Sequence, residues 1–315
     1  MILGLGLAGL YFGAEWLVNG AAGLARNLGL SPILIGLTVV AFGTSAPELV
    51  VSIVSSVQGR SMIAVGNVIG SNICNIALVL GLSACMHPIE STPSVVRRDI
   101  PLMLFISFYL LLISIDSTIS RIEGVTLLGG LVLYTVANYR MAMRVDRFAA
   151  ARADDEIAIA SSSKSKQVLL TILGIAVVVA GAELVVHAAV SLMTAFGVNE
   201  KFIGLTVVAF GTSLPELATS AMAAVRGEMD ISIGNLIGSN VFNILSVLGA
   251  AALARPISIA GGFFESGLIV DYTIMIIVSA LPLFMMQKDA MISRANGVAL
   301  LLCYSGYLSL LLLKI

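Results

Sequence analysis

The stretch IGLTVVAFGTS at residues 35–45 recurs without change at residues 203–213, a shift of 168 positions. The same shift carries GNVIGSNICNIALVLG at 66–81 onto GNLIGSNVFNILSVLG at 234–249. The two copies align without a gap over residues 13–81. The chain therefore contains two copies of one half, and each copy is expected to adopt the same fold.

The composition places both copies in a lipid bilayer. Of the 315 residues, 58% are hydrophobic and 11% are charged, and the mean hydropathy is +1.04. A soluble domain carries about 25% charged residues. A helix needs roughly 20 mostly apolar residues to span a bilayer. Ten stretches qualify: 2–24, 32–57, 62–85, 99–116, 122–143, 167–193, 201–225, 230–253, 266–286 and 293–313. We therefore expect an all-α integral membrane protein with ten transmembrane helices.

A polar stretch separates the two halves. Residues 144–166, RVDRFAAARADDEIAIASSSKSK, carry charges and serines that cannot lie in hydrocarbon. They are predicted to connect a first repeat at 1–143 to a second repeat at 167–315. Five helices precede the connector, and because five is odd, the second repeat enters the membrane from the opposite side. Such inverted repeats are typical of secondary transporters, which bind their substrate near the bilayer midplane between the repeats.

The distribution of basic residues predicts the orientation. Lys and Arg favour cytoplasmic loops, and an extracellular N-terminus places 12 of the 17 basic residues in cytoplasmic loops and 5 outside. We therefore expect both termini outside the cell membrane and the 144–166 connector in the cytoplasm. The apolar start of the chain has no basic segment before it, so it predicts a membrane helix and not a cleaved signal peptide.

The repeat places acidic and polar side chains inside predicted helices. Thr44, Ser45 and Glu48 lie at positions i, i+1 and i+4, so the threonine and the glutamate share one helical face. Ser71 and Asn75 have the same i, i+4 spacing in the next helix. The second repeat copies these side chains as Thr212, Ser213, Glu216, Ser239 and Asn243. An ionised carboxylate at the bilayer centre costs about 2.5–3.5 kcal/mol. Because the cores of these four helices contain no Lys or Arg, the counter-charge has to be a bound cation.

The donor atoms favour Ca2+ as that cation. Ca2+ takes about 6–8 oxygen ligands, and two carboxylates neutralise one such ion. Cys and His, which would favour zinc or copper, are not among these candidate ligands. Pro47 and Pro215 directly precede the glutamates, and proline removes an intrahelical hydrogen bond. We expect each helix to break there and to release backbone carbonyls, such as those of Ala41 and Ala209, toward the ion.

Structural roles compete with ion binding for each of these residues. The glutamates could be protonated and bonded to a neighbouring helix. The small residues that end at Ser71, and their copy at Ser239, could be a helix-packing face. Asn75 and Asn243 could form interhelical hydrogen bonds. Two further acids, one in the first helix of each half, are expected to serve structure or gating and not ligation: Glu15 and Glu183.

The motif pair G-T-S-x-P-E and G-N-x-x-G-S-N-x-x-N, present at 35–81 and 203–249, resembles the α-repeats of the Ca2+/cation antiporter superfamily. The similarity is greatest to the prokaryotic sodium/calcium exchanger branch. The resemblance implies antiport of Ca2+ against Na+ by alternating access, with the first helices, 2–24 and 167–193, sliding across the core. It implies a central Ca2+ site made of Glu48, Glu216, Thr44 and Thr212. It implies flanking Na+ sites made of Ser45, Ser71, Ser213 and Ser239 and the carbonyls of Ala41 and Ala209. It places Asn75 and Asn243 at the middle.

The resemblance also ranks the possible functions. Potassium-dependent exchangers and some archaeal relatives carry Asp where this chain has Asn243, which disfavours K+ co-transport. Proton-coupled calcium exchangers usually depart from G-T-S-x-P-E, which favours Na+ as the counter-ion. Antiport with H+ or another cation through the same glutamates stays open, since burial favours a protonated carboxyl. An intramembrane hydrolase is disfavoured, because it needs a general base next to its nucleophile and the sequence provides none. A channel is disfavoured as well, because the repeat supplies a single enclosed site and no ring of pore-lining residues.

Partners other than ions and the bilayer are not expected. The net charge of −1 offers no basic surface for nucleic acid. The three cysteines form no CxxC or Cys/His cluster, so neither a disulfide framework nor a zinc site is predicted. We expect no enzymatic activity, no cofactor and no obligate protein partner.

Overall fold

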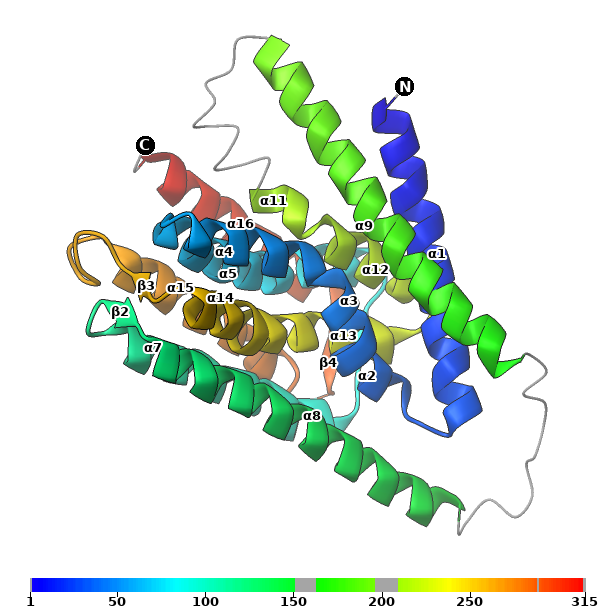
Figure 1. The fold of residues 1–315 in the computed structure, drawn as a ribbon. Coiled ribbons are helices and arrows are strands. Elements are labelled where there is room, and N and C mark those ends of the chain that lie inside the picture. Colours follow the sequence, from blue (N-terminus) through cyan, green and yellow to red (C-terminus); the bar gives the residue numbers. More distant parts are fainter. Residues whose placement is uncertain (1, 151–162, 196–208, 288, 314–315) are drawn as a thin grey trace.

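The computed structural model describes residues 2–150, 163–195, 209–287 and 289–313, which fold almost entirely into helices (Figure 1). Most of the predicted connector lies outside the described residues, and so do residues 201–208 at the start of the predicted seventh segment. Every other predicted segment falls on helical structure. The prediction of a helical protein is therefore confirmed.

The main helices follow one another in the same order in the described parts of the two halves. The first half consists of α1 (Ile2–Leu28); α2 (Pro32–Ile35), a π-helical turn at Gly36–Val40, α3 (Ala41–Thr44) and α4 (Ala46–Val57); α5 (Ser61–Ile73), a π-helical turn at Cys74–Leu80 and α6 (Gly81–Met86); a π-helical turn at Val95–Asp99 and α7 (Ile100–Ser114); and α8 (Arg121–Ala150). The described part of the second half consists of α9 (Lys164–Ala195); α11 (Ala209–Thr212) and α12 (Leu214–Val225); α13 (Met229–Phe242), a π-helical turn at Asn243–Leu248 and α14 (Gly249–Ala254); α15 (Leu268–Met285); and α16 (Arg294–Leu313).

The second helical segment of each half breaks where the prolines predict. Ser45 leaves the regular helical conformation (φ −82°, ψ 8°), and the chain bends by 46° between Pro32–Thr44 and Ala46–Val57. Ser213 has nearly the same backbone angles (φ −88°, ψ 4°). Pro47, two residues after Ser45, lies in the first turn of α4, where a missing N–H removes no intrahelical hydrogen bond. The predicted breaks are confirmed.

Two short strand pairs, which the all-α prediction did not include, join the halves. β1 (Ile89–Glu90) pairs antiparallel with β4 (Met291–Ile292), and β2 (Thr118–Ile119) pairs antiparallel with β3 (Ile257–Ser258). The 168-residue shift relates β1 to β3. Each pair therefore links a strand of one half to a strand of the other, as expected for halves related by an approximate two-fold axis.

The first helices of the two halves, α1 and α9, pack side by side and run antiparallel (Figure 1). Gly6 near the start of α1 lies against Val185 near the end of α9, and Gly23 near the end of α1 lies against Gln167 near the start of α9. The approach requires glycine, because a Cβ on Gly174 would lie 2.4 Å from a backbone nitrogen of α1. In an inverted repeat, equivalent helices of the two halves run in opposite directions, as α1 and α9 do.

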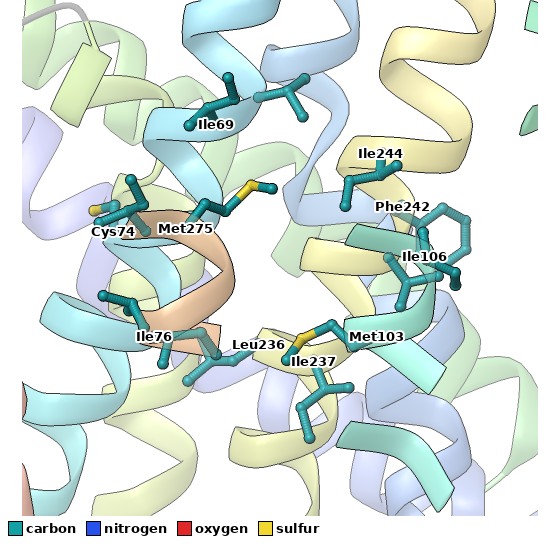
Figure 2. Packing of buried hydrophobic residues seen from close by; sticks show 14 of the residues in the cluster. Ile69, Cys74, Ile76, Met103, Ile106, Leu236, Ile237, Phe242, Ile244 and Met275 are labelled. Carbon is teal, nitrogen blue, oxygen red and sulfur yellow. The ribbon is translucent and has the colours of Figure 1, made fainter. Parts of the chain in front are cut away.

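The segments α5–α6 and α13–α14, each with its π-helical turn, form the centre of the protein. The apolar stretch of α5–α6 is 78% buried and that of α13–α14 is 89% buried, whereas the other candidate spans are 22–33% buried. Their side chains pack on α7 and α15 (Figure 2) through a core that includes Ile69, Ile76, Met103, Ile106, Leu236, Ile237, Phe242 and Met275. The π-helical turns contain Asn75 and Asn243. Such turns often occur at functional sites.

Within the described residues, six helices are long and apolar enough to span a membrane, or seven if the bent pair Pro32–Thr44 and Ala46–Val57 is one span. The predicted ten exceeds this number because several segments are short or interrupted. Helix α7 has 15 residues and α12 has 12. The described helices are those of a multi-pass membrane protein.

Candidate ion-binding site

The helix breaks of the two halves meet in the centre of the protein. The Ser45 hydroxyl donates to Oε1 of Glu216 at 3.0 Å, across a separation of 171 residues. Glu48 and Glu216 are both 0% exposed and interact electrostatically. In each half a serine from the next helix donates to the glutamate at 3.5 Å, Ser71 to Glu48 and Ser239 to Glu216. The structure thus brings the predicted glutamates and these serines together between the halves.

Each threonine hydroxyl reaches an asparagine of the opposite half. Thr44 Oγ1 donates to Oδ1 of Asn235 at 3.2 Å, and Thr212 Oγ1 donates to Oδ1 of Asn67 at 3.5 Å. The amide nitrogen of each asparagine donates to a serine hydroxyl at 2.9 Å. That of Asn67 also lies 3.3 Å from the Glu48 backbone carbonyl, which can only accept, so the orientation of the Asn67 amide is fixed. A threonine whose proton points at the asparagine keeps oxygen lone pairs for a cation.

Four asparagines connect the two central helices with two-fold symmetry. Asn72 and Asn240 each donate from Nδ2 to the backbone carbonyl of the other at 3.3 Å. Asn75 Nδ2 donates to Oδ1 of Asn240, and Asn243 Nδ2 donates to Oδ1 of Asn72, both at 3.1 Å. The amide nitrogens of the two predicted asparagines therefore do form interhelical hydrogen bonds, while their carbonyl oxygens do not take part.

Four buried acceptor oxygens of the predicted ligands have no hydrogen-bond partner in the described part of the chain. They are Oε2 of Glu48 and Glu216 and Oδ1 of Asn75 and Asn243. A buried acceptor without a partner costs about 1–3 kcal/mol, and more when it is charged. A cation bound among these oxygens would remove that cost. Ser213, the counterpart of Ser45, is also fully buried.

The backbone at the first break requires one correction. The Ala41 carbonyl, expected to be released toward the ion, accepts the Ser45 N–H at 3.0 Å and lies 3.4 Å from Thr44 Oγ1. The first turn before the break stays hydrogen-bonded because Pro47 removes the N–H of a later residue. A carbonyl oxygen has a second lone pair, so Ala41 can contribute to a site only through that one. Ala209 lies at the start of α11, beside residues outside the described chain.

Sequence reasoning missed the residues that hold the predicted ligands. These are Asn67, Asn72, Asn235 and Asn240, together with the serines that accept from two of them, Ser52 and Ser220. The four asparagines stand in the repeated G-N-x-x-G-S-N-x-x-N motif, so their duplication was a signal. Their partners lie in the opposite half, which no spacing within one repeat can reveal.

Glu15 has a protein partner outside this cluster. Its carboxylate forms an ion pair with Arg226, at the end of α12. Arg26, also on α1, forms a second ion pair with Glu228 at 3.2 Å. These pairs tie α1 to the turn between α12 and α13. A structural or gating role for Glu15 is therefore favoured over ion ligation.

Known proteins resemble this chain over nearly its whole length. The family described as "Sodium/calcium exchanger protein" matches residues 1–140 and 166–313. The inner membrane protein YrbG of Escherichia coli (strain K12) is 37% identical over 303 residues, covering 95% of this chain and 92% of YrbG. The sodium/calcium exchanger MaX1 of Methanosarcina acetivorans is 31% identical over 345 aligned positions, covering 99% of this chain and 97% of MaX1.

The fold gives the same assignment. A solved structure of the sodium-calcium exchanger NCX_Mj, soaked with zero Na+ and Ca2+, matches with a TM-score of 0.84 at 34% identity. The match covers 98% of this chain and 97% of that chain. This chain therefore belongs to the sodium/calcium exchanger family of membrane cation antiporters.

Proposed function

We propose that this protein exchanges Ca2+ for Na+ across the cell membrane and binds both ions between the glutamates of its two halves. The observation that carries the proposal is the set of four buried acceptor oxygens, two from carboxylates and two from amides, that have no hydrogen-bond partner among the described residues. An enclosed set of oxygen donors with two negative charges suits a hard divalent cation. Na+ as the counter-ion is supported by the names of MaX1 and NCX_Mj.

The ligands divide into three groups in this proposal. Central Ca2+ binding is assigned to Glu48, Glu216, Thr44 and Thr212. Flanking Na+ binding is assigned to the hydroxyls of Ser45, Ser71, Ser213 and Ser239 and the carbonyls of Ala41 and Ala209. The carbonyl oxygens of Asn75 and Asn243 lie at the middle. No step of this cycle makes or breaks a covalent bond, so the protein acts as a transporter without a cofactor.

Alternating access follows from two inverted repeats of five spans each, 1–143 and 167–315, joined by a cytoplasmic connector at 144–166. The antiparallel packing of α1 on α9 and the crossed strand pairs support the inversion. The helices α1 and α9 form the moving pair in this proposal. The ion pairs of Glu15 with Arg226 and of Arg26 with Glu228 would hold α1 in the position that the structure describes.

Cysteine labelling tests the inverted arrangement. Arg60 and Glu228 are equivalent by the 168-residue shift and lie in the turns before α5 and α13. In a background with Cys74, Cys85 and Cys303 replaced, Arg60→Cys is expected to react with an impermeant maleimide from outside. Glu228→Cys is expected to react only from the cytoplasm. Reaction of both from the same side would contradict the inverted repeat and the N-out orientation.

Transport in liposomes tests the exchange itself. Purified protein is reconstituted with Na+ inside, and uptake of radioactive Ca2+ from a Na+-free outside medium is measured. We expect fast uptake that stops when the Na+ gradient is collapsed. A pH gradient of the same size without Na+ is expected to drive little uptake.

Proton-coupled Ca2+ antiport is the second candidate function. It is favoured by the complete burial of Glu48 and Glu216 without a basic partner among the described contacts, because a proton neutralises such a carboxylate as well as a metal does. Uptake that follows the pH gradient and ignores the Na+ gradient would replace the Na+ proposal with this one.

A further inference from the structure

We propose that Asn72 and Asn240 are positioning residues of the ion site. Each fixes the side-chain amide of one proposed ligand in the opposite half, so that the ligand turns its carbonyl oxygen to the ion and not its nitrogen. The inference rests on the proposed ion-binding function. It assigns a role to two buried asparagines that are not themselves in the proposed ligand set.

A backbone carbonyl oxygen can only accept a hydrogen bond, and this fixes the Asn240 amide. Nδ2 of Asn240 lies 3.3 Å from the carbonyl oxygen of Asn72. Turning the amide over would place Oδ1 against that carbonyl, so Asn240 presents Oδ1 on its other side. The reciprocal bond, from Nδ2 of Asn72 to the Asn240 carbonyl at 3.3 Å, fixes Asn72 in the same way.

The two fixed amides then orient the two ligands. Oδ1 of Asn240 accepts from Nδ2 of Asn75 at 3.1 Å, and Oδ1 of Asn72 accepts from Nδ2 of Asn243 at 3.1 Å. Rotating either ligand amide by 180° would set two oxygens against each other. Each ligand therefore keeps its own Oδ1 buried, with no hydrogen-bond partner in the part of the chain that the structure describes. A cation is attracted by this oxygen and repelled by the amide N–H groups, so the orientation decides whether the residue can ligate.

The hydrogen-bonded pair Asn72 and Asn240, called the clamp below, also couples the two halves. Asn240 belongs to α13 and orients Asn75 of the first half, while Asn72 belongs to α5 and orients Asn243 of the second. The ligand orientation is therefore correct only while the two central helices hold their register. Hydrogen-bonded groups behind metal ligands commonly change metal affinity by about 10–100-fold when they are removed.

A double-mutant cycle tests the clamp in the purified full-length protein. Ca2+ affinity by titration calorimetry and the Tm without ions are measured for Asn240→Ala, Asn75→Ala and the double variant. We expect Asn240→Ala to weaken Ca2+ binding about tenfold. We expect the double variant to bind Ca2+ within about twofold of Asn75→Ala alone, because Asn240 acts through Asn75.

Asn138→Ala is the matched control. Asn138 is a buried amide on α8 that donates to the Tyr134 carbonyl at 3.1 Å and accepts from Arg98 at 3.3 Å, outside the ion site. Its loss is expected to lower the Tm and to leave Ca2+ affinity unchanged. If Asn240→Ala fails to fold, Asn72→Ala tests the same clamp in a cycle with Asn243→Ala.

Three results would overturn the clamp. If Asn240→Ala lowers the Tm but leaves Ca2+ affinity unchanged, Asn240 is a packing residue like Asn138. A full tenfold loss from Asn240→Ala in the Asn75→Ala background would mean that it does not act through Asn75. Wild-type protein that binds no Ca2+ would contradict the proposed function and the clamp together, whereas the first two results leave the proposed function standing.

Discussion

Glu48→Gln and Glu216→Gln are each expected to abolish Ca2+ transport while the protein stays folded. Gln keeps the size of the side chain and one oxygen that can accept from Ser71 or Ser239, but it removes one of the two negative charges. Removing one partner of a buried ion pair costs about 3–5 kcal/mol. Ca2+ binding is therefore expected to weaken by roughly a hundredfold or more.

The same variants are expected to keep or gain stability without ions. Both glutamates are buried, and each has one oxygen with no hydrogen-bond partner among the residues described. Replacing one carboxylate with a neutral amide removes a buried charge and the repulsion between the two acids. The Tm without ions should stay the same or rise, and the rise in Tm that Ca2+ produces in the wild type should disappear.

Glu90→Gln provides the control, because this exposed glutamate lies on β1 outside the site. It should transport Ca2+ at the wild-type rate. Near-wild-type exchange by either Glu48→Gln or Glu216→Gln would contradict the two-carboxylate site. A large difference between the two variants would contradict their equivalence under the internal repeat.

The sequence predicted the features that depend on local chemistry. The break at Ser45 follows from Pro47, because proline has no N–H for the carbonyl four residues earlier and the preceding helix cannot continue through it. The helices follow from long apolar stretches that no soluble fold could bury. The approach of Glu48 to its copy was predicted from the repeat, since transporters with inverted repeats bind their substrate where the two copies meet.

Features that depend on contacts between the halves could not be read from one repeat. The hydrogen bond from Ser45 to Glu216 joins residues 171 positions apart. The strand pairs involve two residues each, too few to produce an alternating pattern. The sequence gives Asn72 and Asn75 no distinct roles, and only their contacts with Asn240 separate them. Asn72 donates to the Asn240 backbone and is a positioning residue, whereas Asn75 donates to the Asn240 side chain and has an Oδ1 with no partner among the described residues.

A second large effect is expected where α13 crosses the π-helical turn at Gly36–Val40. A Cβ on Gly238 would lie 2.6 Å from the carbonyl oxygen of Leu37 and 2.8 Å from its Cα. These are backbone atoms, which cannot rotate away as a side chain can. The turn and the helix would have to separate, and the turn continues directly into α3, which carries Thr44.

Gly238→Ala is therefore expected to lower the free energy of unfolding by about 1–3 kcal/mol, the usual cost of overpacking. Ca2+ affinity should fall with it, because separation would move Thr44 away from Asn235, the hydrogen-bond partner that α13 brings to the site. Gly129→Ala on α8 is the matched control, since a Cβ there has no atom within 4 Å. The control should keep or gain stability, because alanine favours a helix over glycine by about 1 kcal/mol. Thermal unfolding and Ca2+ titration of both variants test the prediction. If Gly238→Ala has the same Tm and the same Ca2+ affinity as Gly129→Ala, this helix contact tolerates a methyl group and does not set the geometry of the site.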